Sequence, residues 1–194
     1  MLVDILLGPW VSARSVGPQL HRSSGMLETF EQYTARLLSY SAGQDPRAVL
    51  STTGDRLRGL IEGRTREELS RADGPARWSV AQILAHLADA EIVAAWRFRS
   101  ILAQDAVAVQ PYDQDVWADA FKYAEVDPAD SLRVFDVNRK ATLALVQRVD
   151  PARHNHHGMH AERGRESIQH LLHLYAGHDL NHLTQVERLL TGSD

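Results

Sequence analysis

The chain has 194 residues, a formal net charge of −4 at pH 7 and 44% hydrophobic residues, a balance typical of a globular protein. It has no cysteine, which excludes disulfides, thiolate metal sites and a cysteine nucleophile. The acidic balance argues against nucleic acid as a partner, and no apolar run reaches the roughly 20 residues of a membrane span. We therefore expect a cytoplasmic protein whose partner is a small molecule.

Residues 1–25 differ in composition from the rest of the chain, because Gly, Pro and Ser interrupt a short apolar start. No Lys or Arg precedes the apolar stretch, so it does not match a signal peptide. We expect a poorly ordered extension over 1–25 and one folded domain over 26–192. We hypothesise that Met26 is the biological start.

From Met26 onward, the spacing of apolar residues predicts helices. A short first helix is expected over residues 28–40. A second helix begins at Asp45-Pro46, where Asp is the N-cap and Pro takes the first helical position, and it ends near Gly63.

Three longer helices follow. Ser79 and Gln82 form a capping box, which opens a helix whose apolar residues recur with a 3.6-residue period through residue 101. The next helix is expected over 127–150, with an Asp-Pro pair at each end, and the last over about 164–190.

No segment alternates apolar and polar residues over the length of a strand, and β-branched residues are sparse. The prediction is therefore an all-α fold with four principal helices and a short extra helix at the N-terminus. The longest connection runs from Gln104 to Glu125. A connection of this length in a compact bundle is functional or contains a short helix.

Histidine is the unusual count, with 10 residues. His178 and His182 are four residues apart in the last predicted helix, which places them about 40° apart on one face. Both imidazoles could therefore reach one ion, although such a pair also arises by chance. Gln185 lies on the same face. Asp179 points about 100° away, so we do not assign it the role that Glu has in an HExxH metalloprotease helix.

A metal site needs a third ligand, and His86 is the best candidate because it lies inside the long capped helix among apolar neighbours. A lone histidine on an apolar face is more often a core residue. His170 is a fallback ligand. The four histidines at 154–160 are expected to lie in a solvated polar loop, from which His160 could still approach the site.

Four segments together resemble the DinB/YfiT-like family of metalloenzymes. The two that carry the candidate ligands are W-S-V-A-Q-I-L-A-H-L-A-D-A-E at 78–91 and Y-A-G-H-D-L-N-H-L-T-Q at 175–185. Between them lie P-Y-D-Q-D-V-W-A at 111–118 and E-R-G-R-E at 162–166. The resemblance covers roughly residues 27–190.

The resemblance implies an up-down four-helix bundle in which the connection between the second and third main helices is long. It implies a divalent metal ion on His86, His178 and His182, and a homodimer. Family members of known activity are thiol-dependent transferases and an isomerase that use low-molecular-weight thiols. Zinc is the favoured ion, with nickel, iron and copper as alternatives.

The resulting hypothesis is a metal-dependent enzyme, a hydrolase or a thiol-dependent transferase, that activates water or a low-molecular-weight thiol. No residue stands out as a general base. Supporting roles are considered for Gln185 and His160, and for Tyr112, Asp113 and Trp117 at the mouth of the site, where loop anchoring is an equally good explanation. The alternative is a non-catalytic metal-binding or dimerisation module of the stress-response type.

Overall fold

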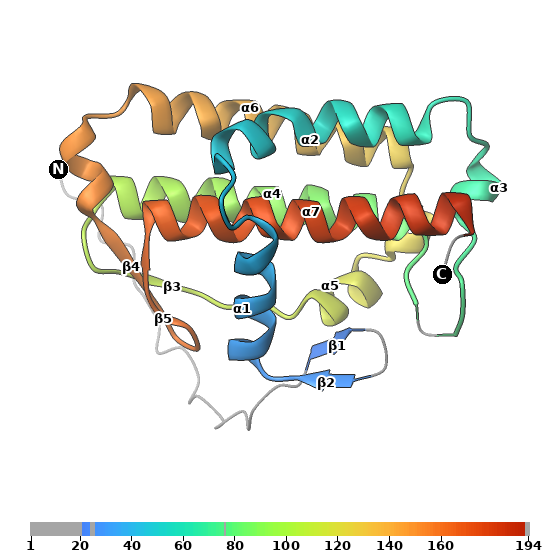
Figure 1. Cartoon of the computed structure of the whole chain (residues 1–194), viewed down its shortest axis with the longest axis horizontal. Helices are drawn as coiled ribbons and strands as arrows, with labels where there is room; N and C mark the ends of the chain where they lie inside the picture. The colour runs from blue at the N-terminus through green and yellow to red at the C-terminus, as the bar shows by residue number, and fades with distance from the viewer. Residues whose placement is uncertain (1–20, 24–25, 76, 193–194) are drawn as a thin grey trace, which may run out of the picture.

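The computed structural model describes residues 21–23, 26–75 and 77–192 (Figure 1). Four long helices form a bundle: α2 (Pro46–Ile61), α4 (Val80–Ala103), α6 (Pro128–Arg148) and α7 (Ile168–Thr191). The shorter α1 (Phe30–Tyr40) crosses α7 from outside the bundle (Figure 1). No helix among the described residues is long and apolar enough to span a membrane.

The four-helix bundle and its long second connection are confirmed. Helices α2 and α7 run side by side in one direction, and α4 and α6 run side by side in the other (Figure 1). The chain order is therefore up, down, down, up. The connection over 104–127 makes this order possible, because it returns the chain along the bundle before α6 begins.

The local signals for helix ends hold in the structure. Ser79 and Gln82 form the predicted capping box, and Asp45 and Asp127 cap α2 and α6 ahead of a proline. The predicted start of the last helix near residue 164 is wrong. Residues 164–167 are extended, and the N-cap of α7 is Ser167, whose side chain accepts from the backbone N–H of His170.

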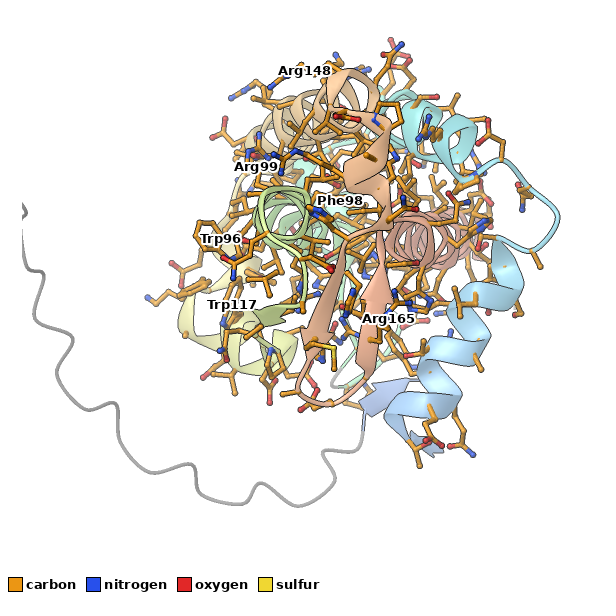
Figure 2. The ribbon with its side chains drawn as sticks, turned by 90° about the vertical axis from the view of Figure 1, so that its left-hand side faces the viewer. Trp96, Phe98, Arg99, Trp117, Arg148 and Arg165 are labelled. Atoms are coloured by element: carbon orange, nitrogen blue, oxygen red, sulfur yellow. The ribbon has the colours of Figure 1, made fainter. Side chains whose placement is uncertain are left out.

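A small sheet was not predicted and adds a minor element to the helical fold. It consists of β3 (Val107–Val109), β4 (His157–His160) and β5 (Gly164–Ser167), with β4 in the centre, parallel to β3 and antiparallel to β5. Figure 2 shows β4 and β5 passing between the ends of α4 and α7. A Cβ at Gly158 would lie 2.5 Å from Val109 Cγ2 and 2.8 Å from Ile101 Cδ1, so glycine lets β4 pack against α4.

Short elements complete the chain: β1 (His21–Ser23), β2 (Met26–Glu28), α3 (Arg66–Leu69), α5 (Gln114–Ala120), η1 (Tyr123–Glu125) and η2 (Pro151–Asn155). The connection after α4 thus contains a short helix, which was one of the two explanations considered for its length. Of the predicted extension over 1–25, residues 1–20, 24 and 25 lie outside the described residues. Strand β1 pairs antiparallel with β2.

The expectation of a solvated histidine loop at 154–160 is wrong. His154 and His156 lie in η2 and at its end, where their ring nitrogens hydrogen-bond to the carbonyls of Val146 and Ile101. His160 lies in β4 and is 2% exposed. Contacts with the ends of α4 and α6 therefore bury much of a segment that looks polar in sequence.

One buried arginine ties the four bundle helices together. Arg139 of α6 donates to the carboxylates of Glu91 in α4 (2.7 Å) and Asp179 in α7 (2.6 Å), and to the Leu50 carbonyl in α2 (2.9 Å). All three ionic side chains are nearly inaccessible to solvent. This cluster fixes α4 against α7 close to the histidines described next.

Candidate metal centre

His86, His178 and His182 converge in the bundle interior. Nε2 of His178 lies 3.0 Å from Nε2 of His86 and 3.1 Å from Nε2 of His182. One ligand atom from each ring lies within 4.8 Å of the other two, and all three residues are buried. Among the described residues this is the one group of three or more His, Asp or Glu side chains with such spacing, and His170 is not part of it.

The donor set fits a divalent metal ion. Metal ligation requires neutral imidazole, and burial lowers the pKa of His182 to about 4. Gln185 Oε1 lies 2.7 Å from His182 Nδ1 and accepts a hydrogen bond from its N–H, so the lone pair of Nε2 faces the other two rings. Three imidazole nitrogens are a ligand set used by zinc and other late transition metals, and they leave coordination positions for other molecules.

Neighbouring side chains hold the ligands in place. The Trp78 ring packs 4.9 Å from the ring of His86. One turn after His86, Asp89 accepts a 2.6 Å hydrogen bond from the Tyr123 hydroxyl, which anchors η1 to α4. Asp179, next to His178, pairs with Arg139.

His178 also lies in the wall of an open pocket of about 700 Å³, solvent at its mouth included. The walls come from α1, α4, the connection after β3, the start of α5, the turn between β4 and β5, and α7. The other lining residues are Tyr33, Thr34, Leu37, Ala90, Arg97, Pro111, Tyr112, Gln114, Glu162, Arg163, Leu174 and Tyr175. The pocket therefore opens from the solvent onto one of the candidate metal ligands.

Of the three residues predicted at the mouth of the site, Tyr112, Asp113 and Trp117, only Tyr112 lines the pocket. The tilted ring of Trp117 packs against Tyr112 with ring centroids 4.6 Å apart. Asp113 instead caps α5, where it accepts from the backbone N–H groups of Asp115 and Val116. His160 lies behind the pocket, with Nε2 3.4 Å from Nη2 of Arg97.

Sequence reasoning missed Arg97, Tyr175 and Arg163, which line the same pocket as His178. For Arg97 a signal was present. It shares the apolar face of α4 with Ala94 and Ile101 and is 5% exposed. Charged residues are rarely buried, so a charged residue on such a face indicates a specific role.

The comparisons with known proteins agree with this geometry. Residues 50–186 match the DinB superfamily, and the chain belongs to this family. A protein of Oceanobacillus iheyensis is 27% identical over 66% of this chain and 74% of its own length. YfiT of Bacillus subtilis is 24% identical over 73% of this chain and 80% of its own length. Both bear the name "putative metal-dependent hydrolase".

The solved structure of Bacillus subtilis YfiT shares the fold. It is described as "a probable metal-dependent hydrolase with an unusual four-helix bundle topology". The TM-score is 0.69 and the sequence identity is 21%, over 88% of this chain and 91% of that chain. The family resemblance and the bundle fold expected from the sequence are therefore confirmed.

Proposed function

We propose that this protein is a metal-dependent hydrolase that binds one divalent ion, zinc in the first instance, on His86, His178 and His182. The observation that carries the proposal is the convergence of three buried Nε2 atoms beside an open pocket. The names of the relatives support it. A divalent ion on three neutral imidazoles would supply Lewis-acid activation of water or of a substrate carbonyl.

The chain's own residues prepare the site for this chemistry. Gln185 fixes the tautomer of His182, and Trp78 packs against His86. Tyr33, Tyr112 and Leu174 give the pocket apolar walls that would hold a substrate next to His178. Glu162, at the exposed side of the pocket, is the one carboxylate among its described lining residues.

A thiol-dependent transferase is the second form of the proposal. The chain has no cysteine, so a sulfur nucleophile would have to be a small thiol bound in the same pocket. The non-catalytic alternative predicts metal binding without turnover. We further propose a homodimer through α4, where Ile92 and Trp96 are 46% and 72% exposed and one turn apart, with Trp96 directed outward in Figure 2.

The test is a screen of the zinc-loaded chain against aryl esters, lactones and amides, and against electrophiles with small thiols. We expect hydrolysis that requires zinc, disappears in His178→Ala and persists in His173→Ala, which removes a histidine of α7 outside the metal-ligand group. Turnover only in the presence of a thiol would instead support the transferase. Zinc binding without turnover on any compound would support the non-catalytic module.

A further inference from the structure

Arg97 is a buried cation that has no acidic partner among the described residues. It is 5% exposed, and its guanidinium donates from Nη1 to the Tyr175 hydroxyl (3.3 Å) and from Nη2 to the Gln110 carbonyl (2.8 Å). Both acceptors are neutral. Its Nε has no hydrogen-bond partner among the described residues.

Arg139 and Arg163, in contrast, are paired with carboxylates. Arg139 lies between Glu91 and Asp179, and Arg163 lies 2.6 Å from the buried carboxylate of Glu166. Burying a charge without a counter-charge is costly, so buried arginines generally have a carboxylate beside them. For Arg97 that carboxylate is absent among the described residues, and the guanidinium faces the pocket.

Two further donors lie beside Arg97. The Tyr175 hydroxyl accepts from Arg97, and its own proton has no acceptor among the described residues. Burial raises the pKa of Tyr175, so the phenol keeps that proton.

His160 supplies the other donor. Its Nδ1 accepts from the backbone N–H groups of Glu162 and Arg163, at 3.2 and 3.3 Å. The neutral ring therefore carries its proton on Nε2, which lies 3.4 Å from Nη2 of Arg97. Two donors thus face each other, an arrangement that an oxyanion bound beside both of them would satisfy.

We infer that this part of the pocket is a carboxylate subsite, formed by Arg97 and Tyr175 in the pocket wall with His160 behind Arg97. A single guanidinium with neutral donors suits a planar monoanion, whereas a phosphate dianion would call for further cations. Arg163 is already neutralised by Glu166, and Glu162 adds a negative charge at the pocket.

The subsite also defines the class of ligand. Tyr33, Tyr112 and Tyr175 line the pocket, and Tyr112 packs its ring 5.9 Å from the Arg97 guanidinium carbon. Tyr175 lies one helical turn before His178, an axial rise of about 4.5 Å. The ligand is thus a small carboxylate with an aromatic or apolar part, held with its remainder towards the histidines. The identification of this carboxylate as the substrate rests on the proposed function. Its binding to the pocket is independent of that function.

The test compares benzoate with benzamide, its uncharged analogue, and with phenyl phosphate. Binding to the full chain is measured by isothermal titration calorimetry, with zinc bound and after zinc removal, so that coordination of the metal is separated from pairing with Arg97. We expect benzoate to bind at least tenfold more tightly than benzamide in both forms. We expect this preference to disappear in Arg97→Gln and to persist in Arg99→Gln, which removes an exposed charge two residues away on α4.

Equal binding of benzoate and benzamide, or a preference that survives in Arg97→Gln, would overturn the inference. Tighter binding of phenyl phosphate would overturn the assignment to a carboxylate. If Arg97→Gln does not fold, Tyr175→Phe removes a single oxygen, and we expect it to lower the benzoate preference several-fold; an unchanged preference counts against the subsite. Benzoate binding without zinc-dependent turnover would leave the subsite standing and defeat the hydrolase.

Discussion

Replacing Arg139 with Met tests the role of the buried ion cluster directly. Arg139 is the cation between Glu91 and Asp179, and the arginine and both carboxylate side chains are less than 10% exposed. Methionine matches the length of the arginine stem but donates no hydrogen bond. The substitution therefore leaves two buried carboxylates and the Leu50 carbonyl without their donor.

The expected loss is large. Removing one member of a buried ion pair typically costs about 3–5 kcal/mol, because the remaining charge stays buried. Two carboxylates lose their partner here, so we expect a loss in the free energy of unfolding at the upper end of that range. Burial already raises the pKa of Glu91 against the opposing effect of Arg139, and without the arginine this pKa rises further.

The loss of stability in Arg139→Met should also depend on pH. A carboxyl group whose pKa is raised by folding binds more protons in the folded than in the unfolded chain, so stability falls as the pH rises through the folded pKa. The deficit of Arg139→Met relative to wild type should therefore be larger at pH 7.5 than at pH 5.5. Urea denaturation of the zinc-free chains at the two values measures it.

Two control variants sharpen the comparison. Lys140→Met removes an exposed charge next in the chain, and we expect it to change stability by less than about 0.5 kcal/mol. Glu91→Gln with Asp179→Asn, added to Arg139→Met, should recover part of the loss because the unpaired charges are gone. A deficit for Arg139→Met below about 1 kcal/mol, or one independent of pH, would refute the reasoning.

Three other predictions follow from individual contacts. Gln185→Leu removes the acceptor of His182 Nδ1–H and should weaken zinc binding about 10–100-fold in a competition titration with a chelator, whereas unchanged affinity would deny Gln185 this role. Gly177→Ala places a Cβ 1.8 Å from the Leu37 carbonyl oxygen, so it should lower the free energy of unfolding in urea by about 1–3 kcal/mol. The control is Gly59→Ala in α2, where nothing lies within 4 Å of the added Cβ. It should leave the free energy of unfolding unchanged or raise it by up to about 1 kcal/mol. Burial and neighbouring arginines lower the pKa of His160 to about 4, so the folded chain binds fewer protons than the unfolded chain and stability falls as the pH drops from about 6.5 to 4. His160→Gln should lose less stability over that window, and an equal loss would contradict the assignment.

The parts of the fold that could be predicted are those determined by residues close together in the sequence. The capping box of Ser79 and Gln82 joins residues three apart, and the 3.6-residue period of α4 and α7 is a property of each helix alone. His178 and His182 share a face for the same reason. His86 lies on another helix. Its place among apolar neighbours made it the best candidate for a third ligand, and the family resemblance then placed it beside the other two.

The parts that sequence analysis missed depend on contacts between distant segments. The sequence of strand β4 does not alternate apolar and polar residues. The strand forms because β3 and β5 pair with it and because Gly158 fits against α4. Arg97 and Arg139 lie on apolar faces of predicted helices, a pattern that marks buried charge. Their partners lie on other elements, so the sequence cannot show that Arg139 meets carboxylates and Arg97 does not.

Metal content tests the central claim most directly. The purified chain is loaded with zinc, freed of excess metal by gel filtration and measured by elemental analysis, beside the double variant His178→Ala, His182→Ala and the matched double variant His170→Ala, His173→Ala. The three-histidine centre predicts one equivalent in the wild type and in the His170, His173 variant, and none in the His178, His182 variant. One equivalent retained without His178 and His182, or none in the folded wild-type chain, would contradict it.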